Sequence, residues 1–145
     1  MSELIFVRYL HFIGLFLVVA TVFAEAVLLK RVLKRSVVQT IFKIDGLYGL
    51  SSMIVVGAGL YLWFGIGKPA EYYTNNPIFI TKVLLFLIVG ILSIWPTVFY
   101  FKNRKGEAED EITIPEHLRL ILKVELLLLF CIPLLATLMA QGVGL

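Results

Sequence analysis

The feature that most constrains this chain is a series of four long apolar runs joined by short polar connections. The runs cover residues 4–29, 44–66, 78–101 and 118–140. Each run is close to the length at which an α-helix crosses about 30 Å of hydrocarbon. The chain is therefore predicted to be an all-α integral membrane protein with four spanning helices.

Composition supports this prediction and limits the number of domains. Of the 145 residues, 60% are hydrophobic and only 16% are charged, which is too little polar surface to coat a water-soluble globule. Four spans and their turns use the whole length, so residues 1–145 are expected to form a single domain in the lipid bilayer. The lone Cys131 lies in an apolar run, which excludes an internal disulfide and a paired-thiolate zinc site.

The distribution of basic residues predicts the orientation. Although the net charge of +3 would suit a nucleic-acid-binding protein, the lysines and arginines sit at the ends of apolar runs, so nucleic acid is excluded as a partner. Ten of the thirteen belong to the first and third connections or the helix ends beside them, and the other three are Arg8, Lys68 and Lys82. The positive-inside rule then places the first and third connections in the cytoplasm and both termini outside. The first run has no positive bias at its start, where Glu3 and Arg8 lie, and a basic cluster follows it, so it is expected to be retained as a span.

Helix starts are indicated at three places. Residues 36–39 (Ser-Val-Val-Gln) and 113–116 (Thr-Ile-Pro-Glu) have the capping-box pattern, and Asn76-Pro77 offers an N-cap followed by proline at the first helical position. The charge run at residues 102–111 (KNRKGEAEDE) is expected to be a solvated turn.

Short alternating connections predict an up-down-up-down bundle in which sequence neighbours pack antiparallel. Pro96 and Pro133 each remove a helical hydrogen bond and are expected to kink their helices. Small residues one turn apart would let the helices approach closely. These pairs are Ala20 with Ala24, Ser93 with Thr97, and Ala136 with Ala140.

The first group of polar residues within the spans is predicted near the outer side. It contains His11 and Lys82, with Arg8, Tyr9 and Gln141 nearby. A neutral imidazole is a good ligand for haem iron, and a lysine could ligate the other face or pair with a propionate. Equally, His11 could only hydrogen-bond within the bundle while Lys82 extends to lipid headgroups. The other histidine, His117, is predicted at the opposite face, so bis-histidine ligation within one chain is excluded.

The second group is predicted near the inner side and contains Glu25, Asp45 and Glu125. Carboxylates in a weakly solvated place can act as a proton or cation relay. The favoured interpretation is that they form ion pairs with the basic rim and anchor the helix ends, because the penalty for charge fades near the interface. Glu125 is the exception because it lies deeper. The expected counter-charges are Lys43, Arg119 and Lys123.

Four short strings resemble a bacterial family of four-helix membrane proteins of unknown function. They are residues 9–12 (YLHF), 45–49 (DGLYG), 93–97 (SIWPT) and 139–142 (MAQG). This resemblance covers almost the whole chain and implies a multi-pass protein of the bacterial inner membrane.

A more distant resemblance is to the HemJ-type protoporphyrinogen oxidases and the CopD-like membrane proteins. Leu10-His11 and the string at 82–85 (KVLL) are similar to the HemJ histidine early in the first helix and lysine early in the third. This resemblance implies porphyrinogen oxidation or haem-linked electron transfer. The chain has residues 22–25 (VFAE) where HemJ commonly has Trp-Phe-x-Gly, and Ile80 where it has a second histidine. Tetrapyrrole binding is thus favoured over enzyme activity.

Three functional hypotheses follow from the sequence. The leading one is binding of haem b or another tetrapyrrole in a redox or porphyrinogen-oxidase-like role, with His11 as iron ligand and Lys82 as second ligand or propionate partner. The second is a proton-coupled or cation transporter that uses Glu25, Asp45 and Glu125. The third is a structural subunit of a larger membrane complex or homo-oligomer, which the small-residue pairs permit.

Overall fold

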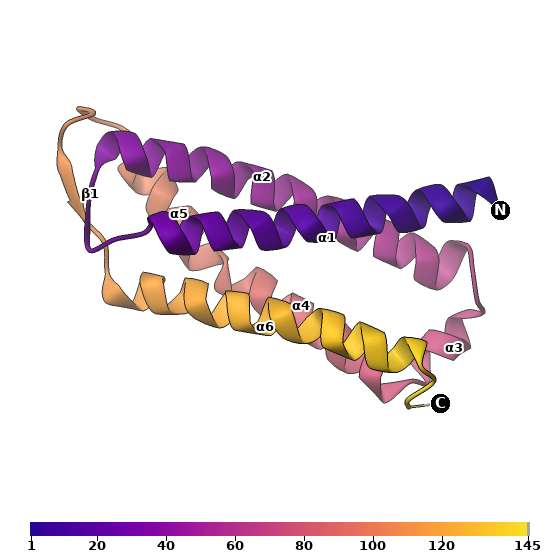
Figure 1. Cartoon of the computed structure of the whole chain (residues 1–145). Helices are drawn as coiled ribbons and strands as arrows, with labels where there is room; N and C mark the ends of the chain where they lie inside the picture. The colour runs from indigo at the N-terminus through magenta and orange to yellow at the C-terminus, as the bar shows by residue number, and fades with distance from the viewer. Residues whose placement is uncertain (145) are drawn as a thin grey trace.

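A computed structural model describes residues 1–144 of the chain, in which four long helices run side by side (Figure 1). The first is α1 (Ser2–Leu28), the second is α2 (Arg35–Leu60) continued by the π-helical segment η1 (Tyr61–Gly65), the third is α4 (Pro77–Leu92) followed by α5 (Ile94–Asn103), and the fourth is α6 (Glu116–Ala140). They contain 27, 31, 27 and 25 residues and are apolar enough to cross a membrane. The predicted all-α architecture with four spanning helices is confirmed.

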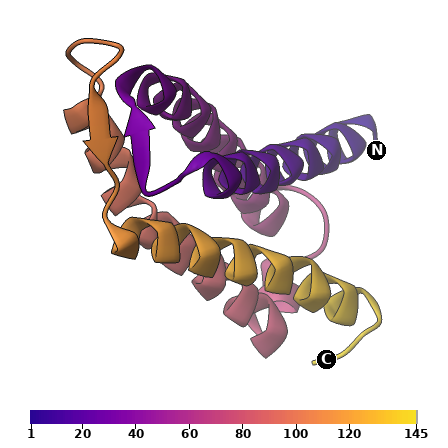
Figure 2. The same ribbon diagram turned by 60° about the vertical axis from the view of Figure 1, so that its left-hand side comes forward.

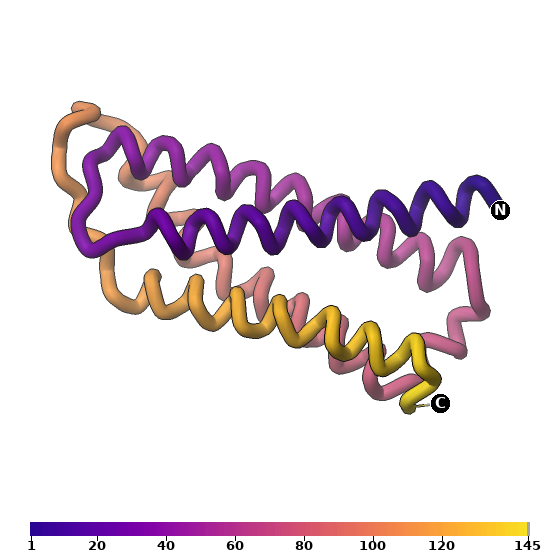
Figure 3. Tube along the Cα trace, in the orientation of Figure 1, coloured from indigo at the N-terminus to yellow at the C-terminus, as the bar shows by residue number. Residues whose placement is uncertain are grey.

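The helices alternate in direction, so the bundle has two distinct ends. Both chain termini lie at one end, which we call the terminal end (Figures 1 and 3). The connections formed by residues 29–34 and 104–115 lie at the other, which we call the sheet end. Along the bundle, α1 packs mainly against α2 and α4 packs mainly against α6, and Figure 2 shows these two pairs from a second direction.

The third span follows its sequence signals closely. The Asn76 side chain accepts a hydrogen bond from the Ile78 backbone N–H at 2.9 Å, with Pro77 at the first helical position, so the predicted cap is confirmed. The helix stops at Leu92 and resumes as α5. Pro96 has no N–H for the carbonyl four residues earlier, which is the physical reason for a break at this point. By contrast, α6 continues through Pro133.

Both predicted capping boxes are wrong. The N-cap positions are Lys34 for α2 and Pro115 for α6, and neither helix start has a side-chain cap. The reason lies in a small antiparallel sheet that the sequence did not predict, in which β1 (Val32–Lys34) pairs with β2 (Glu111–Thr113). The sheet draws the backbone just before each helix into an extended form.

The charge run at residues 102–111, which belongs to the third connection, contacts the end of the first connection and the start of α2. Arg35 donates a hydrogen bond to a carboxylate oxygen of Asp110 at 2.8 Å and another to the Asn103 carbonyl at 3.1 Å. Lys34 pairs with Glu109 at 2.9 Å on the surface. Together with the β1–β2 ladder, these contacts connect the start of α2 to the end of α5.

Two apolar clusters fill the interior, and much of the remaining apolar surface is exposed to lipid, as at Phe16 and Leu127. The sheet-end core contains Leu29, Leu33, Val38, Ile41, Tyr100, Ile114, Leu118 and Leu122. The central core contains Val18, Val22, Tyr48, Val55, Val89, Leu129 and Ile132.

Candidate functional site

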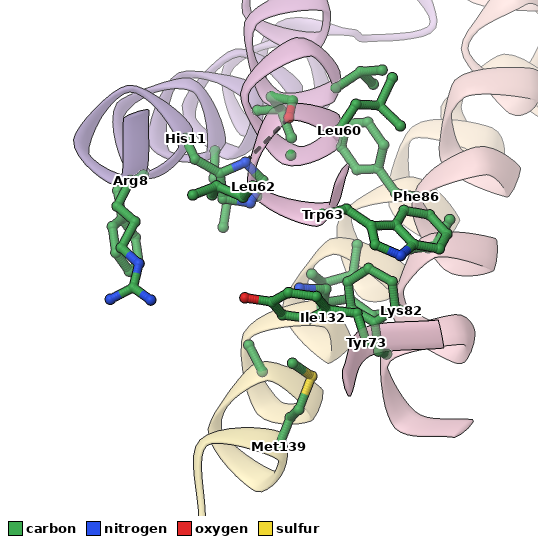
Figure 4. Close-up of a pocket in the computed structure, with 18 of the residues that line it drawn as sticks. Arg8, His11, Leu60, Leu62, Trp63, Tyr73, Lys82, Phe86, Ile132 and Met139 are labelled. Carbon is green, nitrogen blue, oxygen red and sulfur yellow. Dashed lines mark hydrogen bonds between the residues drawn. The ribbon is translucent and has the colours of Figure 1, made fainter. Parts of the chain in front are cut away.

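A cavity of about 460 Å³ lies near the terminal end of the bundle (Figure 4). All four spans contribute to its walls, through His11 of α1, Gly59 of α2, Lys82 of α4 and Met139 of α6, and η1 adds Trp63. The walls are mainly apolar, with few polar groups. A concave apolar site of roughly 300–1,000 Å³ with a few converging polar groups is the usual form of a small-molecule site.

The ring of His11 is fixed by the second span. Its Nδ1 lies 3.1 Å from the backbone carbonyl oxygen of Val55, and because a carbonyl can only accept, Nδ1 carries the proton and donates. The other ring nitrogen, Nε2, therefore presents a lone pair. Gly59 makes room for this arrangement, since a Cβ at that position would lie 3.2 Å from His11 Cε1.

Lys82 is the second polar side chain that lines the cavity. Its Nζ makes no hydrogen bond or ion pair with any residue in 1–144, and its one aromatic contact is with the ring of Phe79, whose centroid is 5.2 Å away. Arg8 borders the same cavity (Figure 4). Of the residues that the sequence grouped near the outer side, the structure thus brings together Arg8, His11 and Lys82 around a single apolar space, whereas Tyr9 and Gln141 do not line it.

Aromatic residues of the α2–α4 connection close one side of the cavity. The Trp63 ring meets Phe79 edge to face at a centroid distance of 4.8 Å, and its Nε1 donates to Thr74 Oγ1 at 3.0 Å. Tyr73, which follows in the short helix α3 (Ala70–Thr74), also packs on Phe79. The sequence analysis did not place these aromatics at a site. The π-helical turn that directs Trp63 inward has no local sequence signal.

The three acidic residues of the inner group meet in the interior and form what we call the carboxyl cluster. Glu25, Asp45 and Glu125 are 1%, 5% and 1% exposed. Glu25 lies within electrostatic range of both other carboxyl groups, and Asp45 within range of Glu125. Thr97 of α5 donates a hydrogen bond of 2.6 Å to Asp45 Oδ2. The cluster thus joins all four spans.

The favoured interpretation of these residues as partners of the basic rim is wrong. Within residues 1–144 the ion pairs are Lys34 with Glu109 and Arg35 with Asp110, so Lys43, Arg119 and Lys123 pair with none of the three carboxyl groups. The reason is helical geometry. Lys43 and Lys123 each lie two residues before a buried carboxyl, and side chains two apart on a helix point to opposite sides.

The two polar sites are separate and neither has the geometry of a protein-only metal centre. No group of three or more His, Cys, Asp or Glu within the described part of the chain is arranged to hold a metal ion. Along each helix the central core intervenes between the sites, as Val18 and Val22 do between His11 and Glu25 on α1. The cavity and the carboxyl cluster are therefore two distinct candidate sites.

These features define the class of the protein as a four-helix integral membrane protein with a cavity and a buried acidic cluster. The chain belongs to the family described as "Predicted membrane protein (DUF2214)", which matches residues 4–144. The resemblance to an uncharacterised four-helix membrane family is thereby confirmed, while the likeness to HemJ-type and CopD-like proteins stays a prediction. No curated protein and no solved structure matches the chain.

Proposed function

We propose that the terminal-end cavity binds haem b or a related tetrapyrrole, with His11 Nε2 as ligand to the iron. The observation that carries this proposal is the hydrogen bond from His11 Nδ1 to the Val55 carbonyl. Histidines that ligate metals usually donate their other ring N–H to a carbonyl or carboxylate, which fixes the tautomer and the orientation of the ring. His11 already has this arrangement.

The other residues that line the cavity also suit a tetrapyrrole. A tetrapyrrole is a flat apolar ring with anionic propionates, and the cavity combines apolar and aromatic walls with two basic side chains, Arg8 and Lys82. Lys82 has no anionic partner within residues 1–144, so it would be available to pair with a propionate or to serve as a second ligand to the iron. Bound haem would supply one-electron redox chemistry, and the protein would supply orientation and a water-poor environment.

Charge distribution supports a location for this site on the outer side of a bacterial inner membrane. Ten of the thirteen lysines and arginines lie toward the sheet end of the bundle, which the positive-inside rule assigns to the cytoplasm. The cavity lies at the opposite end. In this orientation the tetrapyrrole would exchange electrons or substrate with partners outside the cytoplasm.

The proposal is tested by the absorbance of protein purified from haem-replete cells. The wild-type protein should show a Soret band, and His11→Ala should lose most of it because the ligand is removed. His117→Ala is the matched control, since the exposed His117 lies at the sheet end and should leave the band unchanged. Colourless wild-type protein, or equal loss in both variants, would exclude His11 ligation.

A further inference from the structure

The carboxyl cluster contains three buried acidic side chains that have no positively charged partner in the part of the chain that the structure describes. Glu25, Asp45 and Glu125 are at least 95% buried, and no lysine, arginine or histidine within residues 1–144 forms an ion pair with them. The effective penalty for burying one ion is several kcal/mol, and removal of a partner is strongly destabilising. Three ionised carboxylates cannot stay together here unless a positive species lies among their oxygens.

The other polar groups that face the cluster are hydroxyl groups. Thr97 donates to Asp45, and the Tyr100 hydroxyl lies next to Glu25. Tyr48 faces the cluster from α2, beside Asp45 and Glu125. Every ligand atom available here is therefore oxygen, and the titratable groups that face the carboxyls are the two tyrosines.

Several of these oxygens have no partner. Oε1 of Glu25, Oε1 of Glu125 and the hydroxyl of Tyr100 are buried and make no hydrogen bond. The Tyr100 side chain is fully buried, and its hydroxyl lies next to Glu25. Buried polar atoms without partners are rare in folded proteins and call for an explanation. A small species held among them would satisfy these atoms.

Apolar residues close the cluster on both sides. On α1, Glu25 lies between Val22 of the central core and Leu29 of the sheet-end core. The other two carboxyls repeat this placement, with Asp45 between Ile41 and Tyr48 on α2 and Glu125 between Leu122 and Leu129 on α6. The cluster is thus an isolated polar layer between two apolar layers.

We propose that the carboxyl cluster is an occluded proton-binding site, in which Glu25, Asp45 and Glu125 hold and exchange protons. Protons fit better than a divalent cation because no three acidic or metal-binding side chains in residues 1–144 have metal-site geometry. Exchange is expected toward the sheet end, because α1 ends at Leu28, one turn beyond Glu25, and it requires the sheet-end core to open. This site does not depend on tetrapyrrole binding at the other end.

Infrared spectroscopy of the purified wild-type protein at neutral pH tests the proposal without any substitution. Protonated carboxyl groups give a C=O stretching band distinct from that of carboxylates, and it shifts to lower frequency in D2O. We expect this band in the wild-type protein. Its absence would overturn the proposal, because the carboxyls would then be ionised.

Two further measurements assign the band. Glu125→Gln should reduce it, whereas Glu109→Gln, in the exposed loop, should leave it unchanged. A band that none of Glu25→Gln, Asp45→Asn and Glu125→Gln reduces would overturn the assignment. Loss of the band when sodium chloride replaces choline chloride at constant pH would also overturn it, since the site would then bind a metal cation.

Discussion

At the scale of single residues, one main-chain hydrogen bond decides which nitrogen of His11 is available. Without the Val55 carbonyl, either tautomer could form and the ring could turn. With it, Nδ1–H is engaged and Nε2 is left as an acceptor. The His11 ring lies directly against Gly59. A side chain at position 59 would therefore disturb the orientation of the imidazole.

The first prediction follows from this contact. Gly59→Ala adds a Cβ 3.2 Å from His11 Cε1 and 3.6 Å from Nδ1, so the ring must shift by a few tenths of an ångström away from its contact with the Val55 carbonyl. Loss of orientation of a metal ligand typically lowers affinity about 10- to 100-fold. We expect a decrease of this size in haem affinity, measured by absorbance titration of the apoprotein. Gly57→Ala, whose Cβ would meet nothing within 4 Å, should bind like the wild type. Equal affinities for the two variants would contradict the role of His11.

The second prediction concerns the charge of Lys82. Lys82→Met replaces the apolar stem of the lysine with an unbranched apolar side chain of similar size and removes the ammonium group. Hydrogen bonds to charged groups contribute about 1.5–3 kcal/mol, which corresponds to roughly 10- to 100-fold in affinity. We expect weaker haem binding by this factor with the Soret band retained, because His11 is intact.

Lys68→Met is the control for this substitution. Lys68 is exposed and lies over the Tyr72 ring at 4.0 Å, and neither residue lines the cavity. Haem titration of the two methionine variants separates a specific role of Lys82 from a general effect of charge. If both bind haem as tightly as the wild type, Lys82 has no part in the site.

At the scale of helices and strands, α1 and α2 lie close together at Gly14, a residue that the small-residue pattern missed. A Cβ at Gly14 would lie 2.8 Å from Val55 Cγ2 and 3.3 Å from the Ser51 carbonyl oxygen. The predicted close contact at Ala20 and Ala24 is not where these helices meet most tightly, since Ala20 is exposed. The absence of a side chain at Gly14 lets α1 lie against Val55 and Ser51 of α2.

The third prediction tests this contact. Gly14→Ala should destabilise the protein by about 1–3 kcal/mol, the usual range for overpacking, because the β-branched Val55 cannot easily turn away. The measurement is thermal unfolding in detergent, followed by circular dichroism. Gly46→Ala is the control, since a Cβ there would meet nothing within 4 Å and alanine is the better helix former. A melting temperature for Gly14→Ala at or above that of the control would show that the helices can readjust.

Sequence reasoning succeeded where the determinants are local or periodic. The spans follow from run length, and the cap at Asn76 and the break before Pro96 follow from two or three adjacent residues. The β1–β2 ladder could not be predicted, because Lys34 pairs with Glu111 across 77 positions and both strands are only three residues long.

The two candidate sites could likewise be predicted only in part. Depth within the spans was enough to group His11 with Lys82, and Glu25 with Asp45 and Glu125. The partners of these residues depend on helix rotation and on side chains from other helices. For this reason the contact of His11 with the Val55 carbonyl, and the lack of ion pairs to the carboxyl cluster within residues 1–144, became visible only in three dimensions.

At the scale of the whole molecule, the bundle has two polar layers at different depths, with the central core between them. The cavity lies toward the terminal end and the carboxyl cluster toward the sheet end. Which side of the membrane each site serves therefore depends on one property, the orientation of the bundle. Lysines and arginines are concentrated toward the sheet end, and this is the physical basis for placing that end in the cytoplasm.

The fourth prediction tests this orientation by labelling of single cysteines. In a Cys131→Ala background, which removes the native thiol, Lys68→Cys places a thiol in the exposed connection at the terminal end, and Lys105→Cys places one in the exposed loop at the sheet end. A membrane-impermeant maleimide added to intact cells should label Lys68→Cys and should reach Lys105→Cys only after the membrane is permeabilised. The reverse pattern would place the cavity on the cytoplasmic side. A tetrapyrrole at His11 would then face cytoplasmic partners, and the carboxyl cluster would exchange protons with the outside.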